Sequence, residues 1–168
     1  MSDKSDSDNM NVSGKPVDIT ATAAKRIDQV NDWLYVGGAL PPEEYQRLVA
    51  LGIRRIVDLR EQVPDDSGAL DAVGIERHHA PVINHRAPTD AQLEEVARSI
   101  AAMGEDRPVY VHCAGGFGRA TTMAIGLLVK HGTSLDEAIE QVRNARPETL
   151  LNDEQIAWLR ALEAQSRR

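Results

Sequence analysis

Short apolar runs alternate with longer amphipathic stretches along most of the chain. A short apolar run bounded by polar residues or glycine is typical of a buried strand, and an apolar stripe with helical spacing predicts an amphipathic helix. Alternation of the two favours a parallel sheet covered by crossover helices. We therefore expect strands at residues 33–36, 53–59, 75–79 and 109–111, and helices at 41–51, 65–73, 89–103, 120–131, 134–145 and 152–165.

Two of these segments are well defined by their pattern alone. Residues 89–103 begin with a threonine that can cap a helix and stop before a glycine. Within them, Leu93, Val96 and Ile100 form an apolar stripe. Residues 109–111 are apolar at every position, which predicts a central strand buried on both faces. The expected fold is therefore α/β, with a central, mostly parallel sheet flanked by helices.

The first 16 residues differ in character from the rest. They are rich in Ser, Asp, Asn and Gly and have no apolar periodicity, which predicts a disordered leader at residues 1–16. Residues 17–168 suit one folded domain, because domains commonly contain about 100 to 200 residues. Apolar residues make up 42% of the chain and charged residues 27%, so a buried core and a polar surface are both available.

The charge balance narrows the classes of partner. Nineteen basic and 26 acidic residues give a net charge of −7, and no long basic run interrupts this balance. We therefore expect neither nucleic acid nor a membrane as a partner. The sequence has no apolar N-terminal segment and no long apolar run, so the cytoplasm is the expected location. We also expect a monomer.

The single cysteine, Cys113, stands where the predicted central strand ends and the next helix begins. Arg119 follows six positions later. Ligands of open α/β sheets bind outside the carboxyl ends of the strands, so the intervening loop lies at the edge where a ligand is expected. The loop residues expected to present their backbone to a phosphate are Ala114, Gly115, Gly116, Phe117 and Gly118.

This loop has the chemistry of an anion site that also holds a nucleophile. Its backbone N–H groups can fold inward as a nest, and the N-terminus of the following helix adds roughly half a positive charge. The same field favours a thiolate at Cys113. Arg119 can hold two phosphoryl oxygens through its planar guanidinium. Together these groups match the charge of a phosphoryl group in transfer and require no metal or other cofactor.

The order His112-Cys113, five residues, Arg119 resembles the signature of the cysteine-dependent protein tyrosine phosphatase superfamily, including its glycines at positions 116 and 118. The resemblance implies a phosphotyrosine phosphatase-like fold. It also implies hydrolysis in two steps, in which Cys113 attacks phosphorus to form a phosphocysteine and water then releases phosphate.

The likeness extends over most of the chain after the leader. It includes the LYVGG strand, the GIRRIVDLRE strand, the proline-bounded loop at residues 81–88 and the Asn152-x-x-Gln155 start of the last helix. The chain looks most like the small dual-specificity branch of the superfamily.

Four other interpretations of Cys113 stay open. It could be a buried structural cysteine beside glycines. A cysteine loop above a sheet also serves sulfur transfer and arsenate reduction, although the loop length and the preceding His112 fit the phosphatase signature better. The site could also belong to a phosphate-binding pseudophosphatase with little turnover.

The loop at residues 81–88, PVINHRAP, departs from the resemblance at one position. Relatives carry there the aspartate that protonates the leaving oxygen, whereas this chain has Asn84, 29 positions before Cys113. An amide cannot donate that proton, so we favour Asn84 as an impaired general-acid position. Three explanations stay open: His85 or Asp90 takes over the role, the leaving group needs no acid, or the site binds without efficient turnover.

Ala120 is the second departure. The family has Ser or Thr directly after the arginine, and its hydroxyl eases departure of the cysteine sulfur. Thr121 lies about 100° further around the helix, so it would replace that hydroxyl only if the start of the helix is shifted. We therefore expect slow hydrolysis of the phosphocysteine.

Four further polar residues each have a structural and a functional interpretation. His112 either orients the cysteine loop by hydrogen bonding or is a satisfied core histidine. Asp58 and Arg60 either line the mouth of the site or form a surface ion pair. Gln155 matches a position that helps to place the hydrolytic water in some relatives, or it is a solvated helix residue.

The sequence does not predict a metal site. His78, His79 and His85 cluster along the chain, but consecutive strand residues point to opposite faces of a sheet. The predicted activity is hydrolysis of phosphomonoesters, with phosphotyrosine, phosphoserine or phosphothreonine in a protein, or a small phosphate ester, as substrate. The lack of lysine in residues 113–119 disfavours inositol polyphosphates and phosphoinositides.

Overall fold

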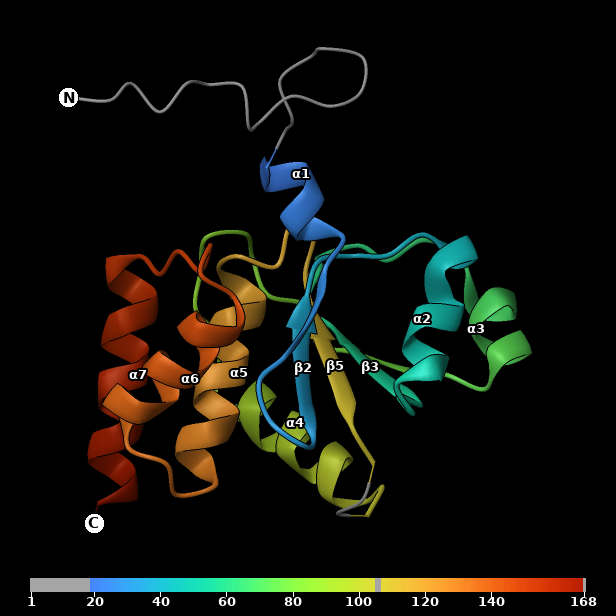
Figure 1. Cartoon of the computed structure of the whole chain (residues 1–168). Coiled ribbons are helices and arrows are strands. Elements are labelled where there is room, and N and C mark those ends of the chain that lie inside the picture. Colours follow the sequence, from blue (N-terminus) through green and yellow to red (C-terminus); the bar gives the residue numbers. More distant parts are fainter. Residues whose placement is uncertain (1–18, 105–106, 168) are drawn as a thin grey trace, which may run out of the picture.

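The computed structural model describes residues 19–104 and 107–167 and contains a five-stranded sheet in the order β1-β2-β5-β3-β4 (Figure 1). Strands β2, β5, β3 and β4 are parallel, whereas β1 runs antiparallel to β2. The expected α/β fold with a mostly parallel sheet is therefore confirmed. The leader predicted at residues 1–16 lies outside the described residues. The strands are β1 (Ile27–Gln29), β2 (Leu34–Gly37), β3 (Arg55–Asp58), β4 (Glu76–His79) and β5 (Val109–His112).

Strand β5 is the central strand, as its apolar run predicted. All four of its residues are buried. In the parallel register, Val111 lies between Val36 of β2 and Val57 of β3. The cysteine loop that follows therefore starts at the middle of the sheet's carboxyl edge, where neighbouring strands can supply groups from both sides.

Helices cover both faces of the sheet, with α4 to α7 on one face and α2 and α3 on the other (Figure 1). Successive strand residues point to opposite faces, so Val109 and Val111 join the core under α4 and α5, whereas Tyr110 packs with Leu48 and Leu70 under α2 and α3. The helices are α1 (Ile19–Ala24), α2 (Tyr45–Ala50), α3 (Ser67–Val73), α4 (Asp90–Ala101), α5 (Arg119–Lys130), α6 (Leu135–Ala145) and α7 (Asp153–Ser166).

Helix α5 is buried from its first residue almost to its last, because α4, α6 and α7 pack around it. A helix that is apolar on all sides is typical of such a position. Where α5 meets α7, Gly126 leaves room for the Trp158 ring, which would lie 3.0 Å from a Cβ at that position. The helix that follows the cysteine loop is therefore fixed on several sides.

The ends of α4 and α7 follow from their sequence. Thr89 and Gln92 form a capping box at the start of α4, and Asn152 and Gln155 form another at the start of α7. None of the helices among the described residues is long and apolar enough to cross a membrane.

Three elements differ from the pattern-based expectation. The helix predicted at residues 41–51 begins as a 3₁₀ turn, η2 (Pro42–Glu44), before α2. Glu44 donates its N–H to the Pro41 oxygen at 2.9 Å, three residues back, which is the 3₁₀ pattern. Helix α1 and strand β1 were not predicted, because six-residue and three-residue segments are too short to show a period.

Candidate active site

A cavity of about 450 Å³ opens at the carboxyl end of β5, where the cysteine loop (residues 113–118) joins that strand to α5. One wall is the cysteine loop with Arg119. A second wall comes from the loop between β4 and α4, and a third from the segment that leads into α7. The lining residues are Asn84, His85, Cys113, Ala114, Gly115, Gly116, Phe117, Gly118, Arg119, Leu150, Leu151, Asn152 and Gln155.

The thiol of Cys113 is 3% exposed and accepts a hydrogen bond from the Gly116 N–H at 3.2 Å. This bond turns an amide of the cysteine loop toward the sulfur. Gly116 has a φ of 79°, and a Cβ there would lie 2.2 Å from the carbonyl carbon of Gly37. Only glycine satisfies both the backbone conformation and this close approach.

The second glycine of the LYVGG motif, Gly38, supports the cysteine loop from β2. A Cβ on it would lie 2.3 Å from the Ala24 carbonyl oxygen and 2.8 Å from that of Ala114. The next residue, Ala39, donates its N–H to the Ala114 oxygen at 2.9 Å. The buried Tyr110 hydroxyl donates to the Gly38 oxygen at 2.5 Å. The motif therefore provides a flat backbone surface against which the cysteine loop packs.

Arg119 is the first residue of α5 and is 8% exposed. Its Nη1 donates to the Val82 carbonyl oxygen at 3.0 Å and lies 3.5 Å from the Leu59 oxygen. These carbonyls hold the guanidinium at the cavity wall. An arginine oriented in this way can bind two oxygens of one phosphoryl group.

Arg146 is a site residue that the sequence analysis missed. It is fully buried at the end of α6, and its Nε and Nη2 donate to the carbonyl oxygens of Gly116 (2.6 Å) and Gly115 (2.8 Å). Its guanidinium also lies 5.0 Å from the centre of the Phe117 ring. With these carbonyls turned toward Arg146, the loop N–H groups are free to face the cavity. Sequence signals for this role are weak, because an arginine at a helix end is usually on the surface.

Two acidic residues hold Arg146 and its neighbour Arg26 in place. Asp28 of β1 accepts from Arg146 Nη1 at 2.9 Å and from Arg26 Nε at 2.8 Å. Arg26 in turn pairs with Glu148 at 2.7 Å, and this hydrogen bond holds the pKa of the Glu148 carboxyl below its usual value. Through Arg146, the ion pairs therefore link β1 to the Gly115 and Gly116 carbonyls of the cysteine loop.

Asp58 forms the ion pair with Arg60 that the sequence left open, but in the interior rather than at the surface. It is fully buried behind the cavity and pairs with Arg60 at 2.7 Å and with Arg77 at 3.3 Å. Burial alone would raise the pKa of its carboxyl, but the hydrogen bond from Arg60 and the nearby His112 ring hold that pKa below its usual value. The predicted ion pair with Arg60 is therefore present, but Asp58 is buried rather than at the surface and does not line the cavity.

His112 is buried and directly precedes Cys113 in the chain. Its Nδ1 is 3.1 Å from the Cys113 carbonyl oxygen, and its Nε2 is 3.8 Å from Asp58. The ring stacks on Tyr110 with centroids 5.4 Å apart. Burial lowers the pKa of this imidazole below its usual value. A neutral ring with its proton on Nδ1 donates to the Cys113 carbonyl, the geometry expected of a residue that orients the cysteine loop.

The two residues after Arg119 lie outside the lining. Ala120 is fully buried and has no hydroxyl. The Thr121 hydroxyl is 2.9 Å from the Phe117 oxygen and 3.1 Å from the Gly118 oxygen. Because α5 begins at Arg119 without a shift, Thr121 bonds to the preceding turn.

The two remaining candidates, Asp90 and Gln155, differ in their position relative to the cavity. Asp90 accepts from the Trp158 indole at 2.9 Å and does not line the cavity. Gln155 is 2% exposed, so its assignment to a solvated helix face was wrong: the capping box turns its side chain inward against the cavity. Within residues 19–104 and 107–167, no cluster of His, Cys, Asp or Glu could hold a metal ion.

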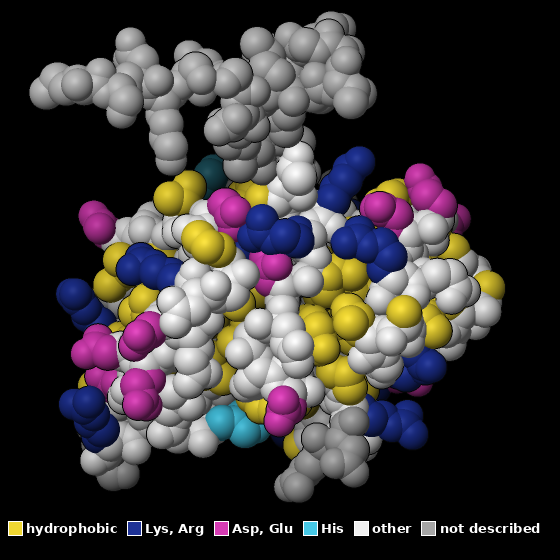
Figure 2. Space-filling view, in the orientation of Figure 1, with side chains coloured by type: hydrophobic (Ala, Val, Ile, Leu, Met, Phe, Trp, Pro, Cys, Tyr) yellow, Lys and Arg dark blue, Asp and Glu magenta, His cyan; other side chains and the backbone are white. Residues whose placement is uncertain are grey.

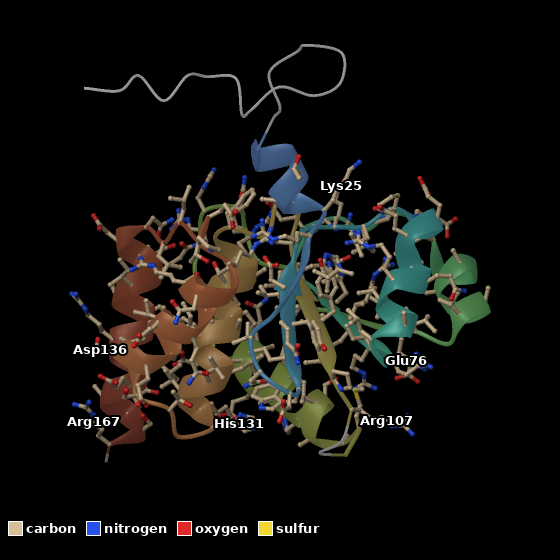
Figure 3. All side chains as sticks on the ribbon, viewed as in Figure 1. Lys25, Glu76, Arg107, His131, Asp136 and Arg167 are labelled. Atoms are coloured by element: carbon tan, nitrogen blue, oxygen red, sulfur yellow. The ribbon has the colours of Figure 1, made fainter. Side chains whose placement is uncertain are left out.

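A second cavity of about 370 Å³, near Arg107 and His131, lies at the end of the molecule opposite Lys25 and α1 (Figure 3). Its lining residues include neither a thiol nor a carboxylate. On the face that Figure 2 shows, basic and acidic side chains are interspersed over the surface. Cys113 and Arg119 both line the first cavity, and neither lines the second.

A central strand, a short loop around one cysteine and a buried helix that starts at an arginine define the fold and site of the protein tyrosine phosphatase superfamily. The chain belongs to the dual-specificity phosphatase family: residues 38–168 match the family model of the Swiss Army Knife protein, DSP-PTPase phosphatase domain. The expected family and the expected branch of the superfamily are thereby confirmed.

Individual relatives agree with this assignment. The chain is 30% identical over 137 residues to phosphatidylglycerophosphate phosphatase PTPMT2 of Arabidopsis thaliana, covering 76% of this chain and 58% of the relative. It is 26% identical over 132 residues to dual specificity protein phosphatase 26 of Bos taurus, covering 74% and 62%. The chain thus spans about six tenths of the length of these relatives. Among solved structures, Tk-PTP in its active form aligns with a TM-score of 0.74 at 29% identity, over 83% of this chain and 97% of that one.

Replacing Arg146 tests its support of the cysteine loop. Arg146→Met removes the donors to the Gly115 and Gly116 carbonyls and one partner of a buried ion pair, so we expect a loss of about 3 to 5 kcal/mol in unfolding free energy. We also expect weaker binding of tungstate, a phosphate analogue. Arg143→Met, on the exposed side of the same helix, is the control and should change stability by less than about 0.5 kcal/mol. Equal effects of the two substitutions would contradict this role.

The buried imidazole of His112 predicts a pH dependence of stability. Its pKa is lower in the folded protein than in the unfolded chain, where histidine titrates at about 6.5. The unfolded chain therefore binds more protons below that pH, and the contribution of His112 to stability is lost as the pH falls through the folded-state pKa. Urea denaturation at pH 7.5 to 5 should show a smaller fall in stability for His112→Asn than for the parent chain. The same slope in both proteins would contradict the assignment.

Proposed function

We propose that this chain hydrolyses phosphomonoesters, on a phosphorylated protein or a small molecule, through a phosphocysteine formed on Cys113. The observation that carries the proposal is that the Cys113 thiol, the N–H groups of the cysteine loop and the Arg119 guanidinium share one cavity. Membership of the dual-specificity phosphatase family supports the same activity. In this proposal the chain acts as a monomer in the cytoplasm and without a metal or other cofactor.

The reaction has two steps. First, the Cys113 thiolate attacks phosphorus, a sulfur–phosphorus bond forms, and the bond to the leaving oxygen breaks as that oxygen takes up a proton. Second, water attacks the phosphocysteine, the sulfur–phosphorus bond breaks, and the thiolate re-forms as inorganic phosphate leaves. The cysteine-loop N–H groups and Arg119 stabilise the charge on the equatorial oxygens in both steps.

The departures from the family pattern affect both steps. Asn84 lines the cavity where relatives carry the proton donor, and its amide cannot protonate a leaving oxygen. Ala120 offers no hydroxyl to the departing sulfur. A phosphate-binding pseudophosphatase with little turnover is therefore the second candidate function, because both replacements weaken turnover and leave the anion site complete.

The mouth of the cavity favours substrates with an apolar group beside the phosphate. Leu150 lines the cavity and is 74% exposed, and Ile83, next to Asn84, is 63% exposed. Large apolar side chains at this exposure are suited to contact with a ligand. An aryl phosphate such as phosphotyrosine fits this rim, and no lysine in the cysteine loop adds charge for a second phosphate.

Loss of the nucleophile is the first test. With para-nitrophenyl phosphate, whose leaving group needs little acid, we expect the parent chain to release nitrophenol and Cys113→Ser to release none. Vanadate binding by both proteins controls for an intact anion site. If the parent chain binds vanadate but hydrolyses no ester between pH 5 and pH 8, the pseudophosphatase is correct and the hydrolase is not.

The second step is tested by Ala120→Ser. With slow departure of sulfur, the parent chain should release about one equivalent of nitrophenol in a rapid burst before a slower steady rate. Ala120→Ser restores the hydroxyl and should shrink the burst while raising the steady rate. Rapid-mixing absorbance measurements follow both phases. A parent chain with no burst, and a variant with an unchanged steady rate, would show that the second step is not limiting.

A further inference from the structure

We propose that His85 is the general acid that protonates the leaving oxygen, an inference that rests on the proposed hydrolase function. The imidazolium of His85 donates its proton as the phosphorus–oxygen bond breaks and Cys113 takes the phosphoryl group. The neutral imidazole then accepts a proton from the water that attacks the phosphocysteine, so the histidine ends the cycle as it began. Asn84 thereby keeps a place in the wall but no role in proton transfer.

The composition of the cavity wall is the first argument. Among the described residues that line it, the groups that can exchange a proton are the Cys113 thiol and the His85 imidazole, because the Arg119 guanidinium stays charged. Cys113 is the nucleophile. No aspartate, glutamate, lysine or tyrosine is part of this lining. His85 is therefore the proton donor that this wall offers.

The backbone of His85 is the second argument. Arg86 donates its N–H to the Ile83 oxygen at 2.9 Å, which closes a four-residue turn with Asn84 and His85 at its centre. His85 has a φ of 66° and is the one residue other than glycine with positive φ within the described chain. A turn of this kind prefers Gly or Asn at that position. The chain instead has Asn one position earlier and His in the left-handed conformation, at a cost of about 1 kcal/mol.

Such strain is retained where the surrounding structure holds it and function requires it. The turn is held from α7: Asn152 Nδ2 donates to the His85 oxygen at 2.6 Å, and Gln155 Nε2 donates to the Arg86 oxygen at 3.3 Å. The α7 segment is itself joined to the cysteine loop, since Leu150 donates its N–H to the Phe117 oxygen at 2.8 Å. Residue 85 is therefore fixed relative to the loop that holds the phosphoryl group.

The other acidic groups nearby are already engaged. Glu154 of α7 pairs with Arg86 at 2.9 Å and accepts the Ala87 N–H at 3.1 Å. Glu61, which follows β3, accepts the Asn84 N–H at 3.1 Å. Glu154 and Glu61 are thus bonded to the turn and its neighbours, and Cys113 and Arg119 share the cavity wall with it. Neither carboxylate lines the cavity, so neither competes for the leaving oxygen.

The test compares leaving groups. We expect His85→Asn to lower kcat/KM for phenyl phosphate by about 10² to 10⁴ and to change it little for para-nitrophenyl phosphate. Asn adopts left-handed backbone readily, so the turn is preserved. Asp90→Asn removes the acid that Trp158 engages and is the matched control, with the leaving-group preference of the parent chain. If Asn is not tolerated at position 85, His85→Gly serves instead.

A double variant moves the acid by one residue. Asn84→Asp in the His85→Asn background should restore hydrolysis of phenyl phosphate. The alkaline fall of the rate should then shift to lower pH than in the parent chain, because carboxylic acids lose their proton at lower pH than imidazolium. A role of His85 in folding alone would not produce this shift.

The outcomes are distinct. The assignment of the acid is overturned if His85→Asn loses activity equally on both esters or on neither. It is also overturned if the pH profile of the double variant is unchanged. In those cases hydrolysis of para-nitrophenyl phosphate by the parent chain still stands. If the parent chain does not hydrolyse that ester, the proposed hydrolase itself fails.

Discussion

The shape of the cysteine loop depends on one buried guanidinium, that of Arg146. A loop of six residues presents its N–H groups to an anion only if its carbonyl groups point elsewhere, and buried carbonyls need donors. Arg146 supplies two of these donors, at Gly115 and Gly116, from the end of α6, a helix that begins 22 residues after Cys113. Since its own charge is balanced by Asp28 of β1, the shape of the cysteine loop is tied to the edge of the sheet.

Close backbone packing adds a steric constraint to this electrostatic one. The cysteine loop approaches β2 at Gly37 and Gly38 so closely that a single added methyl at Gly116 would overlap the strand. The central position of β5 brings the loop beside β2 on one side and β3 on the other, and the carbonyls after β3 and β4 then orient Arg119. Cys113 and Arg119 are thus positioned by contacts with the neighbouring strands and the segments that follow them rather than by the loop alone.

Most of the sheet and the cysteine loop could be predicted from the sequence, because both depend on local information: apolar runs, helix caps and the spacing between Cys113 and Arg119. The supports of the loop could not. Arg146 and Asp28 are 118 residues apart, and each alone has the composition of a surface position. The burial of Asp58 was missed for the same reason, since its second partner, Arg77, comes from the neighbouring strand β4. Charges paired over long distances in the chain leave no periodic signal.

The start of α7 shows how one set of residues can serve folding and chemistry together. Through their side-chain oxygens, Asn152 and Gln155 each accept the other's backbone N–H, which satisfies two of the N–H groups at the helix start. Their remaining amide groups hold the carbonyls of His85 and Arg86, on a loop that lies 67 to 69 residues earlier. Because Leu150, just before this helix, donates its N–H to the Phe117 oxygen, the turn at residue 85 and the cysteine loop are held by the same segment. In the proposed reaction, a proton donor on that turn needs no separate element to position it, so moving the donor from residue 84 to residue 85 would change the chemistry of the site and keep its fold.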